Sequence, residues 1–238
     1  YLRAQGVEVV LVSPGGEYAP RLQAEGFRWV EWPVSRQGAN PLEEWSAVRK
    51  LRAILQCEGA QLAHFHTIKP VLYGTWAASY PDGPAVVNSI TGRGYVFLSA
   101  ESKARWLRPW VKLFYRRVLR RPRCELIFEN EADQQYFLQE KLASREHAWL
   151  VRSVGVDVER FCPQPEPEGK PVVLLASRML WDKGAGVFVE AARLLRERNL
   201  ARFALCGAPD PGNPASIPEE TLRGWAEEGA VEWWGFKA

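Results

Sequence analysis

The sequence lacks the features that mark several classes of protein. No apolar run approaches the length of a bilayer-spanning helix, and no secretory signal peptide is visible. No Gly-x-Gly-x-x-Gly follows a predicted strand, which argues against a nicotinamide-dependent dehydrogenase. The four cysteines are far apart and match no metal or redox spacing: Cys57, Cys124, Cys162 and Cys206. We therefore expect no transmembrane helix, no cysteine metal site, and reduced thiols in a cytosolic protein.

Methionine is also nearly absent, which bears on where the sequence begins. Residue 1 is Tyr and the only methionine is Met179, so we expect the natural start to be missing. The 238 residues are enough for one full domain and part of another. A hydrophobic content of 47% and a charged content of 25% are those of an ordinary soluble globular protein.

Charge is unevenly distributed, although the net value is only +3. Residues 100–123 hold nine cations and a single carboxylate, a net charge of +8, which leaves −5 for the rest of the chain. Nucleic-acid binding usually needs a broader basic surface, so the negative remainder argues against it. The pattern instead indicates one basic segment.

Short apolar strands alternate with amphipathic helices, which predicts a doubly wound α/β fold. Strands are predicted at residues 7–12, 27–32, 61–65, 85–90, 125–128, 147–151, 172–176, 201–206 and 231–234. Helices are predicted at residues 17–25, 41–59, 71–79, 106–121, 187–198 and 219–228, and after the cap residue Asn130. A helix end at residues 1–5 implies a further strand before it.

A stretch rich in proline divides the predicted elements into two sets. Residues 162–171 contain four prolines and two glutamates, the composition of a stiff exposed linker. We therefore expect a Rossmann-like domain at residues 1–161 and the start of a second, incomplete one at residues 172–238.

The stretch from Pro171 to Arg198 carries the strongest signal for a binding site. A buried strand leads through a loop into a helix whose predicted apolar face is Val187, Ala191, Leu194 and Leu195. The loop holds two cations and two glycines: Arg178, Lys183, Gly184 and Gly186. Free backbone N–H groups at a helix start and two long cationic side chains favour an anion such as a diphosphate. A solvated surface loop is the alternative.

Three loops of the first predicted domain follow strands, and such loops lie at the ligand-binding edge of a doubly wound sheet. They contribute the candidate ligand-binding residues Gly15, Gly16, His66, Lys69, Thr91, Gly92 and Gly94. Alternation along the strand at 61–65 predicts that His64 and His66 point to the same side. A tight turn or a rim histidine is the alternative for each residue taken singly.

Residues 177–184 read Ser-Arg-Met-Leu-Trp-Asp-Lys-Gly, and Glu-Ala-Ala follows at 190–192. This pattern resembles the donor-site motif of family-4 glycosyltransferases of the GT-B fold, which has two Rossmann-like domains. The resemblance implies that Arg178 and Lys183 bind the diphosphate of a nucleotide-sugar donor, and we add Gly184 and Gly207 to this donor-diphosphate set. We expect no metal, because positive groups and backbone dipoles would stabilise the departing diphosphate.

Two loops of the first predicted domain extend the resemblance. Residues 64–74 read His-x-His-Thr-x-Lys-Pro-x-x-Tyr-Gly, and residues 91–97 read Thr-Gly-x-Gly-Tyr-x-Phe. Both are similar to a bacterial branch that adds sugars to polyprenyl-diphosphate-linked oligosaccharides for surface polysaccharides or glycoproteins. The resemblance implies transfer of a hexosyl or N-acetylhexosaminyl group from a nucleotide-diphosphate donor to a lipid-linked saccharide. It also implies that the ligand-binding candidates of the first predicted domain, from Gly15 to Gly94, lie on the acceptor side.

The sequence departs from the pattern of the family at two positions. The bacterial branch usually has Leu where this chain has Arg93, and other members have an active-site His where Thr91 stands. We therefore assign no catalytic residue, and the anomeric outcome stays open. The family would continue beyond residue 238 into a pair of donor-binding glutamates, so we expect this sequence alone to be inactive.

Residues 106–121 predict a helix with an apolar face and a basic face. Cations beside tryptophans suit anionic lipid headgroups, so we assign membrane contact to Trp106, Arg108, Trp110, Lys112 and Arg116. A cytoplasmic protein, peripheral on the inner face of the cell membrane, follows from this assignment. One alternative is a packed helix with a solvated basic face. Another is a non-enzymatic module that binds anionic lipid or nucleic acid through this helix.

Overall fold

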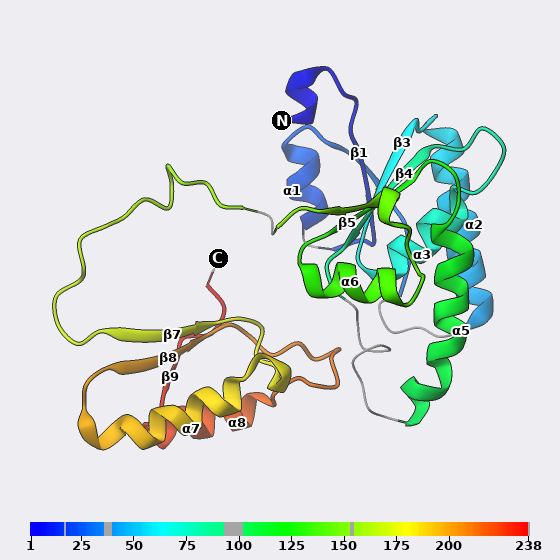
Figure 1. Cartoon of the computed structure of the whole chain (residues 1–238). Coiled ribbons are helices and arrows are strands. Elements are labelled where there is room, and N and C mark those ends of the chain that lie inside the picture. The colour runs from blue at the N-terminus through cyan, green and yellow to red at the C-terminus, as the bar shows by residue number, and fades with distance from the viewer. Residues whose placement is uncertain (17, 36–39, 93–101, 153–154, 238) are drawn as a thin grey trace. The chain divides into compact units, whose positions relative to one another are not determined.

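The computed structural model describes residues 1–16, 18–35, 40–92, 102–152 and 155–237. They form two compact units, Tyr1–Val156 and Asp157–Ala238, whose strands and helices are labelled in Figure 1. Residues 162–171, the predicted linker, are exposed throughout and belong to the second unit. Each unit has its own parallel strands and its own hydrophobic core.

The first unit is built on parallel strands. Strand β1 (Val10–Ser13) pairs with β2 (Arg28–Glu31). A second sheet has the order β3-β4-β5-β6, with bounds Leu62–His66, Ala85–Ile90, Cys124–Phe128 and Ala148–Leu150. All pairings are parallel, so the loops that follow β3, β4 and β5 lie at one edge of this sheet.

Helices connect these strands in the first unit. They are α1 (Tyr18–Ala24), α2 (Pro41–Cys57), α3 (Ile68–Ala77), α5 (Ser102–Leu119) and α6 (Glu131–Gln139), with short 3-10 turns at Leu2–Gln5 and Arg145–His147. The predicted caps are confirmed, since Asn40 accepts a hydrogen bond from the N–H of Leu42 and Asn130 accepts one from Asp133. Among the helices in the described ranges, none combines the length and apolar character needed to cross a bilayer.

The core of the first unit lies between the strands and the helices that cover them. Helix α3 contacts both α2 and α5, and Figure 1 shows the three helices on one side of the strands. The ring of Phe137 on α6 meets Tyr115 and Phe128 edge to face, with centroids 5.6 and 5.2 Å apart. Because all three rings are almost fully buried, they fix how α5 and α6 are rotated against the sheet.

The second unit contains a three-stranded parallel sheet of order β7-β8-β9, with bounds Val172–Ala176, Arg202–Cys206 and Glu232–Trp233. Helices α7 (Ala185–Leu195) and α8 (Glu219–Glu227) lie together on one side of the strands in Figure 1. Single 3-10 turns at Trp181–Lys183 and Arg196–Arg198 flank α7. The core includes Met179, Val189, Leu205, Ile217 and Leu222.

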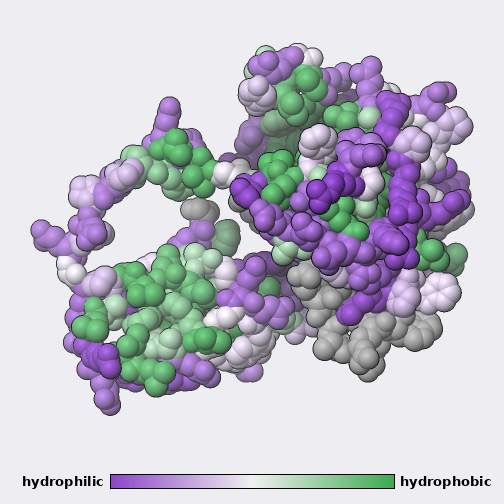
Figure 2. All heavy atoms as spheres, viewed as in Figure 1, coloured by the Kyte–Doolittle hydropathy of each residue, from purple (hydrophilic) through white to green (hydrophobic). Residues whose placement is uncertain are grey.

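Two sequence expectations for the second unit are wrong in the described chain. Helix α7 buries Ala185, Val189 and Ala192, whereas Val187 and Leu194 are 71% and 81% exposed. The apolar residues on α7 cover more than one face, so spacing alone did not show which face meets the sheet. Strand β7 is an edge strand with four exposed residues and is not covered on both faces. Figure 2 shows hydrophobic residues gathered on this unit, over β7 and α7.

Candidate functional site

The first group of predicted site residues lies at the carboxyl end of β3. Burial alternates along this strand, and His64 and His66 are both exposed, which confirms that they share a side. Their ring centroids are 4.2 Å apart, and Nε2 of His64 lies 2.8 Å from the hydroxyl oxygen of Ser89 on β4. Partial burial, and secondarily the neighbouring His66, lowers the pKa of His64. His64 is therefore favoured as a neutral hydrogen-bonding group at physiological pH.

The backbone turns sharply directly after His66. Thr67 has φ 68° and ψ 166°, a conformation that a β-branched residue rarely adopts. Such strain costs about 1–3 kcal/mol and is concentrated at functional sites. Thr67 could not be predicted as a site residue from the sequence, because no residue pattern signals a positive φ at threonine. The strain adds the β3–α3 turn to the candidate site.

Strand β4 brings Thr91 and Gly92 to the same edge of the sheet. His66 is in register with Ser89 on β4, so the residues that follow the two strands are neighbours. Thr91 is exposed, and Gly92 has φ 148° with open space where a Cβ would lie. Gly94, which was also assigned to the acceptor side, lies outside the described residues. The structure thus places His66, Thr91 and Gly92 along one edge.

Gly15 and Gly16 follow β1 and are both exposed. A Cβ on Gly15 would come within 3.0 Å of a carboxylate oxygen of Glu31, whereas one on Gly16 would meet nothing within 4 Å. Gly15 and Glu31 line a cavity of about 460 Å³, together with residues of α2 that include Glu43 and Ser46. Carboxylates and hydroxyls accept hydrogen bonds from polyhydroxylated molecules. The β1 loop therefore borders a hollow whose lining combines such polar groups with apolar side chains.

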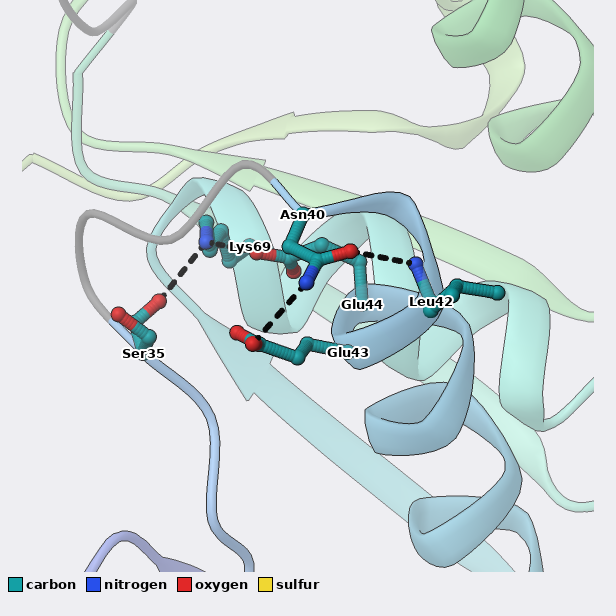
Figure 3. Close-up of polar contacts among 6 residues, drawn as sticks. All are labelled: Ser35, Asn40, Leu42, Glu43, Glu44 and Lys69. Atoms are coloured by element: carbon teal, nitrogen blue, oxygen red, sulfur yellow. Dashed lines mark hydrogen bonds and ion pairs between the residues drawn. The ribbon is translucent and has the colours of Figure 1, made fainter.

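Lys69, in the first turn of α3, connects this hollow to the histidine strand. Its ammonium donates to Oε1 of Glu44 at 2.6 Å and to the carbonyl oxygen of Ser35 at 2.8 Å (Figure 3). Lys69 also lies 5.9 Å from the ring centroid of Tyr73. Burial and a hydrogen bond with Glu44 raise the pKa of Tyr73. Lys69 therefore holds α3 against the start of α2, a role that its place in the sequence motif did not indicate.

The second group of predicted site residues lies where β7 and β8 end. Gly207, directly after β8, has φ 146°, and a Cβ there would lie 1.8 Å from the carbonyl oxygen of Ser177. Only glycine permits this approach, because any side chain would collide with backbone. The N–H of Ser177 also donates to the carbonyl of Cys206 at 3.0 Å. These contacts fix the position of Arg178, the next residue along the chain.

Arg178 is paired with a carboxylate in the structure. Its Nη1 donates to Oδ2 of Asp210 at 2.6 Å, and 54% of the arginine side chain is exposed. The N–H of Asp210 donates to the hydroxyl oxygen of Ser216 at 2.9 Å, which orders the loop after β8. The sequence did not predict this pair, because its members are 32 residues apart.

Lys183 and Gly184 lie at the start of α7. Lys183 ends a 3-10 turn and is exposed, and Gly184 adopts the left-handed conformation with φ 77° as the N-cap residue of α7. The first N–H groups of α7 follow directly, so the helix start offers partial positive charge beside a cation. Within the residues that the structure describes, no cluster of His, Cys, Asp and Glu is placed to hold a metal ion.

The residues assigned to membrane contact all belong to α5, but their surroundings differ. Trp110 is 63% exposed, whereas Arg108 is half-buried. Lys112 pairs with Glu140 at 2.7 Å, and Arg116 donates to the carbonyl oxygen of the same residue at 2.9 Å. Trp106 lies within α5, and its side chain is outside the described part of the structure. Two of the five residues thus contact the end of α6.

A curated protein with a known reaction is similar to this chain over most of its length. The chain is 25% identical over 244 residues to the N,N'-diacetylbacillosaminyl-diphospho-undecaprenol alpha-1,3-N-acetylgalactosaminyltransferase of Campylobacter jejuni subsp. jejuni serotype O:2. The alignment covers 97% of this chain and 62% of that protein. The chain therefore spans less than two thirds of the length of this relative.

Solved structures share the fold. HepE from Anabaena, in complex with UDP and glucose, has a TM-score of 0.70 at 16% identity over 96% of this chain and 62% of its own. A glycosyltransferase from Rickettsia africae has a TM-score of 0.68 at 17% identity over 100% of this chain and 62% of its own. Together with the parallel sheets, these likenesses confirm the predicted α/β fold of the GT-B class.

A family comparison covers most of the first unit. The family model described as "Glycosyl transferase 4-like" matches residues 1–121, just over half of the 238 residues. The matched segment contains the histidine strand, the strained turn at Thr67 and the loop that begins at Thr91. This match confirms the resemblance that the motifs carry. The chain belongs to the glycosyl transferase 4-like family.

Proposed function

We propose that this protein is a glycosyltransferase that moves a sugar from a nucleotide-diphosphate donor to a lipid-linked saccharide. Membership in the glycosyl transferase 4-like family supports sugar transfer. The similar C. jejuni protein is named for an undecaprenyl-diphospho-linked substrate and for N-acetylgalactosamine transfer, and HepE was solved with UDP and glucose. We therefore take a hexose or N-acetylhexosamine as the sugar and a polyprenyl-diphosphate-linked saccharide as the acceptor, in polysaccharide or glycan biosynthesis.

The observation that carries the proposal is the geometry at the ends of β7 and β8. Gly207 allows the two strand ends to meet, which fixes Arg178 at the carboxyl edge of a parallel sheet. Lys183 and the free N–H groups at the start of α7 follow in the same loop. Two cations and a helix start suit the two phosphates of a nucleotide-sugar donor.

The same groups suit the chemistry of transfer. The bond between the anomeric carbon and the diphosphate oxygen breaks, and a bond to an acceptor hydroxyl oxygen forms. The departing nucleoside diphosphate gains negative charge, and the hydroxyl loses its proton. Arg178, Lys183 and the α7 N–H groups would stabilise that charge without a metal ion.

On the acceptor side, we assign the edge of the first unit to the lipid-linked saccharide. His66 lies there in register with Ser89, Thr91 and Gly92 follow the same strand end, and the strained turn at Thr67 adjoins His66. Gly15 lines the hollow at the β1 loop, and Gly16 follows it along the chain. Lys69 would act on the acceptor indirectly, since its ammonium is engaged with Glu44 and Ser35.

A transfer assay with the full-length gene product tests the proposal. UDP-linked hexoses and N-acetylhexosamines are offered with a polyprenyl-diphosphate-linked saccharide, and the extracted lipid is analysed for a mass gain of one sugar. We expect one donor to give the product, and the reaction to continue in the presence of a metal chelator. Absence of any transfer, together with no binding of UDP by calorimetry, would overturn the proposal.

A non-enzymatic module that binds lipid or nucleic acid through the basic helix was the alternative. The family match and the named activity of the C. jejuni relative both favour an enzyme instead. We therefore assign the basic helix α5 to a transferase and not to a separate binding module.

A further inference from the structure

Helix α5 presents an outward face that differs from the membrane-contact set expected from the sequence. Residues three and four apart lie on one side of a helix, so Trp110, Leu113 and Arg117 form a line. Trp110 and Leu113 are 63% and 56% exposed, and Arg117 is exposed as well. Arg120, the first residue after the helix, is exposed and continues the line. We call these four residues the α5 outer face.

The core determines that this face points outward. Tyr115, Val118 and Leu119 of α5 are almost completely buried, and the ring of Tyr115 packs edge to face on Phe137 of α6. Rotation of the helix would remove these side chains from the core and expose their apolar surface to water, which is unfavourable. The outer face is therefore a fixed feature of the first unit.

The cations of α5 do not all have the same surroundings. Lys112 pairs with Glu140, and its ammonium lies 5.7 Å from the ring centroid of Tyr136. Arg116 donates to the carbonyl oxygen of Glu140, which caps the carboxyl end of α6. Cations are stabilising at this end of a helix because its carbonyl groups carry partial negative charge. Lys112 and Arg116 thus join α5 to α6, whereas Arg117 and Arg120 border the exposed Trp110 and Leu113.

An anionic bilayer surface matches the chemistry of the outer face. Helix α5 contains no carboxylate, and residues 100–123 carry a net charge of +8. Tryptophan and leucine beside arginine are suited to the headgroup region, where rings and apolar groups enter and cations remain with the phosphates. Trp76 of α3 meets Phe114 of α5 edge to face at 5.6 Å and is itself 39% exposed. A nucleic acid matches less well, since the rest of the chain carries −5.

We propose that the α5 outer face, Trp110, Leu113, Arg117 and Arg120, binds the chain to an anionic membrane surface, while Lys112 and Arg116 serve to hold α5 on α6. The proposal changes the contact set expected from sequence, in which Lys112 and Arg116 faced the lipid. Its biological meaning rests on the proposed function, because a lipid-linked acceptor lies in the membrane. Lipid binding itself is independent of sugar transfer, so the two proposals can fail separately.

Flotation with lipid vesicles tests the proposal on the 238-residue chain. The vesicles contain phosphatidylcholine and phosphatidylglycerol in about a 2:1 ratio, or phosphatidylcholine alone. We expect binding to the mixed vesicles only, and loss of binding at about 0.5 M salt, where charges are screened within a few Å. The double variant Arg117→Gln/Arg120→Gln should bind about 25-fold more weakly, since each cation contributes about fivefold near such a surface. Trp110→Ala should weaken binding several-fold.

Matched variants separate this face from general charge and from α5 as a whole. Arg152→Gln/Arg198→Gln removes the same charge at exposed positions elsewhere, and Trp149→Ala removes another exposed tryptophan. Lys112→Gln/Glu140→Gln removes the pair between α5 and α6 without changing the net charge. We expect all three to bind as the parent does. Equal losses in these controls, or equal binding to neutral vesicles, would overturn the proposal, as would binding to RNA without binding to vesicles.

Discussion

Two cations that follow the carboxyl ends of strands, Lys69 in the first unit and Arg178 in the second, form ion pairs with different solvent exposure. Lys69 is 24% exposed and contacts both a carboxylate and a backbone carbonyl. Arg178 is 54% exposed, and its carboxylate partner comes from a loop. A half-buried pair of this kind stabilises the fold, because removing one partner leaves the other desolvated. The two carboxylates are about equally buried, at 15% and 14% exposed, so the pairs differ in the cation: the guanidinium of Arg178 is open to solvent and can meet a ligand there.

The largest effect is expected at Arg178. In the full-length gene product, Arg178→Ala should lower kcat/KM by a factor that corresponds to about 2–4 kcal/mol of transition-state stabilisation, with a smaller loss in the free energy of unfolding than at Lys69. Steady-state transfer kinetics and urea unfolding measure the two quantities. Arg198→Ala, at an exposed position in the same unit, is the matched control. Activity of Arg178→Ala within a few-fold of the parent would remove Arg178 from the donor site.

The opposite pattern is expected at Lys69. Lys69→Ala should reduce the free energy of unfolding by about 2 kcal/mol, because Glu44 is then left without its cation. Urea unfolding of the 238-residue chain measures the loss. The double variant Lys69→Met/Glu44→Leu should recover part of it, since neither charge remains unpaired. Full stability combined with lost transfer would mean that Lys69 contacts the acceptor directly, and the comparison would fail.

A smaller effect is expected at Asp210, which tests whether the second pair is exchangeable. Asp210→Asn removes the charge that competes for Arg178, so UDP should bind several-fold more tightly to the 238-residue chain. Isothermal titration calorimetry measures the affinity. Asp182→Asn, an exposed carboxylate near Lys183 in sequence, controls for the change in net charge. Weaker binding by Asp210→Asn would show that Asp210 positions Arg178 instead of competing with the ligand.

The smallest effect is expected at a surface pair of the second unit. Hydrogen bonds from Arg202 and then Trp234 lower the pKa of Glu232 to about 2. A lowered pKa in the folded state stabilises above the ordinary value of 4.5, and the contribution is lost as the pH falls towards 2. Because the pair is largely exposed, Glu232→Gln should cost less than about 1 kcal/mol at neutral pH. The melting temperature, measured at several pH values in this range, should change less with pH in the variant than in the parent. An equal change with pH in both proteins would contradict the assignment.

Much of the fold could be predicted from sequence because its signals are local. The caps at Asn40 and Asn130 depend on residues two or three positions away, and both are confirmed. The side shared by His64 and His66 follows from strand alternation alone. The family follows from short motifs, and the match to residues 1–121 confirms it. The roles of the individual motif residues stay predictions.

The parts that failed depend on contacts between distant residues. Helix α7 carries apolar side chains around more than one face, and only the sheet selects Val189 and Ala192 for burial while Val187 stays exposed. The strain at Thr67 is likewise imposed by the strand and helix on either side of it. Such features have no local signal. The backbone and the side chains adapt to residues that are distant in the sequence, and a local pattern does not show which of these will be in contact.

The sequence by itself therefore determined the order of strands and helices, their caps, and the loops that carry charge, since each depends on a few consecutive residues. Only the tertiary structure decided which charges meet. It pairs Arg178 with Asp210 and Lys112 with Glu140, and it leaves Arg117 beside exposed Trp110 on α5. The physical reason is that a charge takes its function from its distance to other charges and from its access to water, and folding sets both.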